Sequence, residues 1–292
     1  MSNKIVAMIL AGLILVLAGC APQATAAPTA VPSTATPIPP TASLPTVAPT
    51  LPPVPPTAIP TGLPTSTKEP ALAFGRVSLV LPAGLASGIS GAQVERNDSP
   101  DLAAWARTPG HTLVKLEGYA LQGTARQPQI YVFPAMDYVN LRTSAFESIH
   151  RLDNIFASPG ASVTSDQLPA VPFLNELPIF GTHIQVKPFR NGQGVRFLTQ
   201  YAQGLVPINN HELIYVYQGL SSDGEYYVIA ILPVNLAGLP ADSNWNGQQP
   251  APGDAYKKYV NDVVGQLNLQ AASAFTPDLN SLDALMQSIQ IQ

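Results

Sequence analysis

Proline is the residue that most restricts what this chain can fold into, because it is concentrated in one long segment. Fifteen of the fifty residues in segment 21–70 are proline, and Lys68 and Glu69 are its only charges. Proline lacks a backbone donor and blocks helix propagation, and the scattered apolar residues follow no period that would form a core. We therefore expect residues 21–70 to be a disordered, proline-rich stalk, on the order of 150 Å long when fully extended at about 3.1 Å per residue.

The segment before the stalk has the pattern of an export signal. Lys4 supplies a positive charge, and an unbroken apolar run covers residues 5–17. As a helix this run would be about 20 Å long, which is too short for a hydrocarbon core of about 30 Å. Residues 1–19 are therefore expected to be a signal peptide rather than a membrane-spanning anchor.

The signal peptide ends in Leu17-Ala18-Gly19-Cys20, and Cys20 is the only cysteine of the chain. This tetrad resembles the lipobox of bacterial lipoproteins. The resemblance implies cleavage before Cys20, a diacylglyceryl thioether on its sulfur, and a fatty acyl group such as palmitate on its new amine. The protein is then expected at the cell membrane, lipid-anchored and facing outside the cytoplasm. The alternative is an ordinary cleavage site that leaves a free thiol.

Cysteine and charge exclude several classes of function for residues 71–292. This domain contains no cysteine, which excludes structural disulfides, thiol catalysis and zinc sites built on thiolates. Charged residues make up 11% of the chain, the net charge is −4, and no basic block suits nucleic acid. We expect no nucleic-acid partner and no cofactor.

The pattern of residues 71–292 predicts an α+β domain. Residues 74–81, 111–119 and 129–133 are apolar runs typical of strands, and four more runs form an expected meander between residues 182 and 234. A capping box of Ser144 and Glu147 is expected to start a helix whose apolar face includes Phe146. Two further helices are expected from Asp254, as N-cap, and from Pro277, at the first helical position. The expected fold is an antiparallel sheet covered by helices on one face.

The order of these elements is similar to that of the PsbP-type fold, which occurs in photosystem extrinsic proteins and in exported bacterial lipoproteins. The similarity covers roughly residues 74–233 and is carried by HTLVKLEGY, QIYVF and SAFESIHRLDNIF together with the meander. It implies a binding or assembly role and transfers no catalytic motif.

The histidines give no metal or catalytic motif. Glu147 and His150 have the spacing used in carboxylate-bridged di-metal sites, but such sites need two motifs of this kind and the sequence contains one. His211-Glu212 is followed by Leu-Ile-Tyr and lies in a strand pattern, so it does not complete a zinc helix. No nucleophile elbow, phosphate loop or dinucleotide motif is present. We expect the domain not to be an enzyme.

Two groups of residues are candidates for binding. The meander carries five tyrosines that form a candidate ligand surface for a glycan or peptide, with cross-strand aromatic packing as the favoured alternative: Tyr201, Tyr215, Tyr217, Tyr226 and Tyr227. Asp242, Asn244 and Asn246 match the first half of an EF-hand loop, but Gly253 stands where its final Glu belongs, so a plain Asn/Gly turn is favoured over a weak calcium site.

These observations predict a lipid-anchored, non-catalytic binding or assembly domain whose partner is an envelope protein or a glycan. A solute-binding lipoprotein of a transporter is the first alternative, and a hydrolase is the second.

Overall fold

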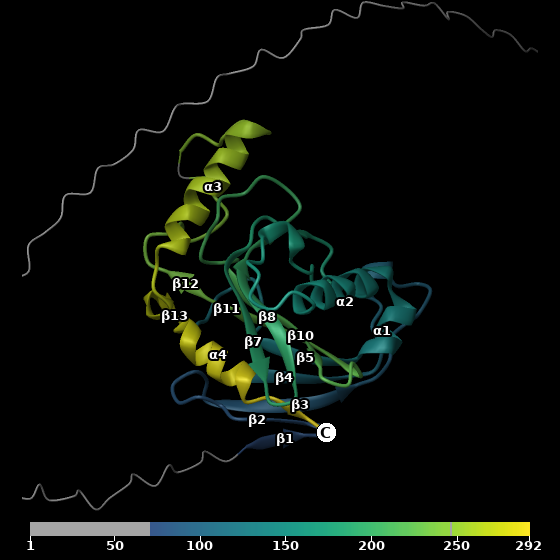
Figure 1. Cartoon of the computed structure of the whole chain (residues 1–292). Helices are drawn as coiled ribbons and strands as arrows, with labels where there is room; N and C mark the ends of the chain where they lie inside the picture. The colour runs from purple at the N-terminus through teal and green to yellow at the C-terminus, as the bar shows by residue number, and fades with distance from the viewer. Residues whose placement is uncertain (1–70, 246) are drawn as a thin grey trace, which may run out of the picture. The chain divides into compact units, whose positions relative to one another are not determined.

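The computed structural model describes residues 71–245 and 247–292. Cys20, the predicted signal peptide, the predicted stalk and Asn246 lie outside the described residues. The described part is built around a seven-stranded sheet (Figure 1).

All neighbouring strands of this sheet are antiparallel, and their order is β3-β4-β5-β11-β10-β8-β7. The expected meander is confirmed, because β7, β8, β10 and β11 pair in sequence. The last of them, β11, pairs with β5, which joins the meander to β3, β4 and β5. The strands are β3 (Gly88–Val94), β4 (His111–Glu117), β5 (Gln129–Pro134), β7 (Thr182–Phe189), β8 (Gly192–Thr199), β10 (Ile214–Ser221) and β11 (Tyr226–Pro233).

The sheet packs against other elements on both faces. Along β10, Ile214 and Val216 join one apolar cluster, whereas Tyr215 and Tyr217 join another. Successive side chains of a strand point to opposite faces, so the two clusters lie on opposite sides of the sheet. The central strands β10 and β11 are therefore buried in nearly every position.

Each cluster has its own pair of helices. Helices α1 (Ala135–Leu141) and α2 (Thr143–Phe156) contribute to the cluster that contains Ile214. Helices α3 (Asp254–Asn268) and α4 (Leu279–Gln287) contribute to the cluster that contains Tyr215. We call these the α2 face and the α4 face (Figure 1). The α+β class and the antiparallel sheet are confirmed.

A small second sheet holds the two ends of the described chain together. Strand β2 (Val77–Leu79) pairs with β1 (Leu72–Phe74) and also with β14 (Gln290–Ile291). The single strand expected over residues 74–81 is thus wrong, because Gly75, with a φ of 58°, turns the chain back on itself. Two further pairs are short: β6 (Leu177–Pro178) with β9 (Tyr201–Ala202), and β12 (Asn235–Leu236) with β13 (Phe275–Thr276).

The helix starts differ from the predicted ones. Helix α2 begins at Thr143 without a side-chain cap, because Ser144 Oγ accepts from the guanidinium of Arg142 and donates to Pro172 O. Helix α3 is preceded by Gly253, so Asp254 is its first residue rather than its cap. Helix α4 is capped by Asp278, whose carboxylate accepts from Asn280 N at 2.8 Å.

Within residues 71–245 and 247–292, no helix combines the length and the hydropathy that crossing a membrane requires.

Candidate functional site

Four of the five tyrosines assigned to the ligand surface are buried: Tyr201, Tyr215, Tyr217 and Tyr227. Three of their hydroxyls have defined partners at ordinary distances. Tyr201 Oη accepts from Val171 N at 2.9 Å, Tyr215 Oη donates to Asp283 Oδ1 at 3.0 Å, and Tyr217 Oη donates to Lys187 O at 2.9 Å. The Tyr227 hydroxyl donates to Gln218 Oε1.

The predicted tyrosine surface is therefore wrong for these four residues, and only Tyr226 is partly exposed. The reason is that the sheet is packed on both faces, so neither set of alternating side chains reaches solvent. Burial raises the pKa of the Tyr215 and Tyr227 hydroxyls well above their ordinary value, and both remain neutral hydrogen-bonding groups.

The calcium candidate forms a local turn. Asp242 Oδ1 accepts from the backbone N of Asn244 at 2.9 Å, which is the Asx-turn geometry of the favoured alternative. Asn246 lies outside the described residues. No group of three or more His, Cys, Asp or Glu residues suited to a metal ion occurs in the described parts of the chain.

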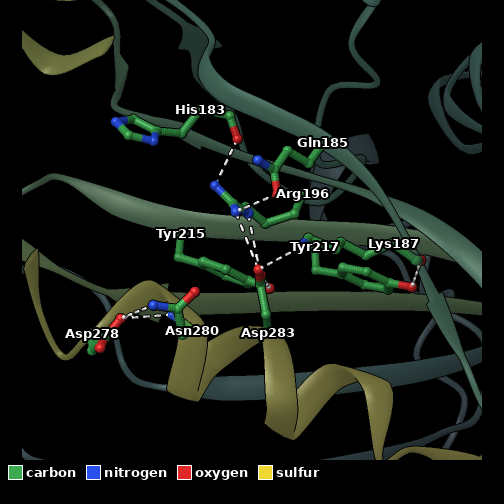
Figure 2. A network of polar contacts seen from close by, with 9 residues as sticks. All are labelled: His183, Gln185, Lys187, Arg196, Tyr215, Tyr217, Asp278, Asn280 and Asp283. Carbon is green, nitrogen blue, oxygen red and sulfur yellow. Dashed lines mark hydrogen bonds and ion pairs between the residues drawn. The ribbon is translucent and has the colours of Figure 1, made fainter. Parts of the chain in front are cut away.

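The densest cluster of charged groups lies on the α4 face and is centred on Asp283 (Figure 2). Asp283 Oδ1 accepts from Tyr215 Oη and from Arg196 Nε at 3.2 Å. Asp283 Oδ2 accepts from Arg196 Nη2 at 3.1 Å and lies 3.0 Å from Lys187 Nζ. The side chains of Arg196 and Asp283 are only 3% and 7% exposed.

The other hydrogen bonds of Arg196 join β8 to the edge strand β7. Arg196 Nη1 donates to His183 O at 2.7 Å, and Nη2 donates to Gln185 Oε1 at 2.9 Å. His183 has a φ of 52° and lies where the register of β7 shifts between Thr182 and Gln185. Among the described residues, the buried side-chain polar atom without a partner is Tyr138 Oη, on the α2 face. Every buried polar group of the Asp283 network is thus paired. The network joins helix α4 to the sheet and has a structural role.

An open groove lies on the outer side of α2, between this helix and residues 158–167. Its volume is about 490 Å³. It is lined by Phe146, Glu147, His150, Arg151, Asn154, Ile155, Ser158, Ala161, Ser162, Val163, Asp166 and Gln167.

Helix periodicity explains why these side chains share one wall. Residues 147, 151, 154 and 158 follow one another at intervals of three or four, which places them on one stripe of the helix. The neighbouring stripe of Ala145, Ser148, Leu152 and Ile155 is buried against the sheet. The stripe of residues 147, 151, 154 and 158 in the groove wall is therefore not packed in the apolar core.

Phe146 is the most conspicuous residue of the groove. The apolar spacing predicted it on the buried face, but its side chain is 52% exposed. Its ring lies parallel to that of His150, at an interplanar angle of 5° and a centroid distance of 6.0 Å. The Glu147 and His150 pair, noted in the sequence for its spacing alone, lies in the same groove.

The second wall is held in place by its own contacts. The Arg151 guanidinium donates to Asp166 O and, at 3.5 Å, to Leu168 O. A capping box closes the turn η2 (Ser165–Gln167), in which Thr164 N donates to Gln167 Oε1 at 2.8 Å. The groove is thus preformed rather than assembled by a ligand.

Sequence reasoning found the helix but missed the groove. The facing loop carries no motif, and its position depends on Arg151 reaching carbonyls fifteen and seventeen residues away. One signal was available, because a phenylalanine beside the stripe of Glu147 and Arg151 is out of phase with the buried stripe of Ser148 and Leu152.

Comparison with known proteins finds no matching family model. It also finds no curated protein and no solved structure that match the chain. The resemblances to bacterial lipoproteins and to the PsbP-type fold stay predictions.

Proposed function

We propose that this protein is a lipid-anchored, extracytoplasmic binding or assembly domain without catalytic chemistry, and that its ligand occupies the groove beside α2. We further propose that the helices cover both faces of the sheet, so that ligands are met by the outer sides of helices and by loops rather than by the sheet itself.

One observation carries the proposal, which is the exposed Phe146 in a preformed groove. Small-molecule sites commonly measure about 300–1,000 Å³, and the volume of about 490 Å³ falls within this range. Such sites combine apolar walls with a few polar groups that orient the ligand. The groove has this composition, with Phe146 and Val163 beside Glu147, Asn154 and Gln167.

The histidine contacts support a non-catalytic role. His111 Nδ1 lies 2.9 Å from Pro109 O, and His183 Nε2 lies 2.7 Å from Leu267 O. Both rings also pack on aromatic neighbours, His111 on Phe133 and His183 on Phe275. These two imidazoles serve packing and backbone pairing, and His150 stacks on Phe146.

The structure does not favour the solute-binding lipoprotein. In the described residues the seven long strands form one sheet, whereas closure of two lobes on a solute requires two separate cores.

The anchor is tested by Cys20→Ala in intact cells. We expect the variant to take up no labelled fatty acid and to leave the membrane fraction, because Cys20 is the only thiol of the chain. A variant that stays membrane-bound, beside a wild type without label, would contradict the anchor.

The groove is tested by screening the full-length chain for saturable binding to glycans, peptides and envelope extract. Phe146→Ala should weaken binding, whereas Met136→Ala should not, because Met136 is 63% exposed but does not line the groove. Equal binding by both variants would exclude the groove as the binding site.

A further inference from the structure

We propose that the groove beside α2 is a subsite for a neutral oligosaccharide, with Phe146 as the surface on which a sugar ring stacks. This inference rests on the proposed binding function and adds the chemical class of the ligand.

The first argument is the aromatic surface. A pyranose ring presents C–H groups on its face and hydroxyls around its rim, so its face packs well on an exposed aromatic ring. Aromatic side chains provide large apolar contact area with defined geometry. Phe146 is 52% exposed, and its ring runs parallel to that of His150, so the sugar meets an aromatic wall in the groove.

The second argument is the arrangement of polar groups beside this wall. Glu147 and Asp166 carry carboxylates, and Asn154 and Gln167 carry amides. Carboxylates accept hydrogen bonds on both oxygens, the Asn154 amide can donate and accept, and Gln167, whose Oε1 accepts from Thr164, can donate through Nε2. Such a set matches neighbouring sugar hydroxyls, each of which is a donor and an acceptor.

The third argument is charge. Glu147 and Asp166 are the acids of the groove, and its one guanidinium, Arg151, already donates to the carbonyls of Asp166 and Leu168. These bonds use only Nη1 of Arg151, but the two carboxylates outnumber its single positive charge, so a phosphate or carboxylate ligand would meet a net negative groove. The groove disfavours anions, and a neutral ligand avoids this cost.

The fourth argument separates a sugar from an extended peptide. Peptides that bind by strand addition need an open strand edge that supplies backbone donors and acceptors. The walls of the groove are helix α2 and a loop with the short turn η2, and the described residues 143–167 contain no strand. Recognition must then come from side chains, as it does for a sugar.

The test uses the full-length chain in detergent micelles and two neutral probes, triacetylchitotriose and maltotriose. Calorimetry should give saturable binding of at least one probe, with an affinity that does not change between low and high salt, because no ion pair forms. Phe146→Ala should weaken that binding about tenfold or more, which corresponds to about 1.4 kcal/mol. Phe146→Trp should preserve it, and Asn154→Ala should weaken it.

Met136→Ala serves as the matched control and should bind like the wild type. Circular dichroism of each variant checks that the fold is intact, which we expect because Phe146 and Asn154 are both exposed.

Two results would overturn the inference. One is the absence of saturable binding by both sugars, and the other is sugar binding that Phe146→Ala leaves unchanged. A lysine-rich peptide and a peptide of residues 21–70 are run in parallel. If either binds in a Phe146-dependent way while both sugars fail, the saccharide inference is wrong and the proposed binding function stands. If no probe and no envelope component binds, both are wrong.

Discussion

On the α4 face of the sheet, Asp283 forms a buried ion pair with Arg196 and a partly buried one with Lys187, whereas on the α2 face the contacts are hydrogen bonds to backbone carbonyls of a loop. There, Ser148 Oγ donates to Ala170 O at 2.7 Å, and Gln218 Nε2 of β10 donates to the adjacent Pro169 O at 2.8 Å. One face is held by a single charge that several donors share (Figure 2), and the other by separate hydrogen bonds to a loop.

This difference indicates which parts of the molecule tolerate substitutions. A buried charge that loses its partner is costly, so the α4 face tolerates little variation around Asp283. The α2 face distributes its contacts over several hydrogen bonds, and the outer stripe of α2 contributes one residue to them, Arg151, which donates to the carbonyls of Asp166 and Leu168. A groove can therefore vary on that stripe without loss of the fold.

The largest effect is expected for Asp283→Ala. This change leaves Arg196 buried without its carboxylate, and removing one member of a buried pair costs about 3–5 kcal/mol. Denaturant unfolding measures the loss. The matched control is Asp262→Ala, whose exposed pair with Lys258 at 2.6 Å should contribute about 0–1 kcal/mol. Equal losses of unfolding free energy in the two variants would show that the buried Asp283 pair stabilises the fold no more than the exposed Asp262 pair.

A smaller loss is expected for Ser148→Ala on the α2 face. The change removes the donor to the partly buried Ala170 O, and a typical intramolecular hydrogen bond contributes about 0.5–1.5 kcal/mol. Ser162→Ala, in the exposed wall of the groove, provides the control and should unfold like the wild type. A loss as large as that of Asp283→Ala would show that the α2 face is as sensitive as the α4 face.

Acid should destabilise both faces, because one carries the buried His111 and the other the partly buried His183. Burial lowers the pKa of His183 on the α4 face and of His111 on the α2 face below the ordinary value of 6.5. Contacts with carbonyl oxygens oppose the shift in both residues, and the positive charge of Arg196 lowers the pKa of His183 further.

The unfolded chain therefore binds more protons than the folded one as the pH falls from about 6.5 through the folded pKa values. Stability should be complete above this range and should decrease through it. Unfolding midpoints measured from pH 7.5 to pH 5 check the prediction. His183→Asn, chosen because Asn tolerates a positive φ, should reduce the loss on the acid side. An unchanged pH profile in this variant would assign the whole effect to other groups.

The smallest effect on stability is expected for Phe146→Ala. Its side chain is half exposed, and substitutions outside the core usually change the free energy of unfolding by no more than about 0.5 kcal/mol. The same variant should nevertheless lose ligand binding. A loss of stability comparable to that of Ser148→Ala would show that Phe146 stabilises the fold and would argue against a role confined to ligand binding.

The elements that were predictable from the sequence are those with strong local patterns. The four strands of the meander contain runs of β-branched and aromatic residues, and α2 has a clear apolar period. Strand β3 was missed because GISGAQV has two glycines and little β propensity, and its conformation follows from pairing with β4. The burial of the four tyrosines could not be predicted, because the strand pattern does not show that apolar clusters form on both faces of the sheet.

The pairing of β11 with β5 has a consequence for how the sheet is assembled. Strands β3, β4 and β5 pair with close neighbours in sequence, and so do β7, β8, β10 and β11. Within the seven-stranded sheet, these halves are joined by the pairing of β11 with β5, which begins with Tyr226 opposite Pro134. Residues 135–225 lie between these two positions in the sequence. Closing so long a loop costs entropy before its contacts form, and folding rates fall as such distant contacts accumulate. We therefore expect each half to acquire structure before β11 docks onto β5.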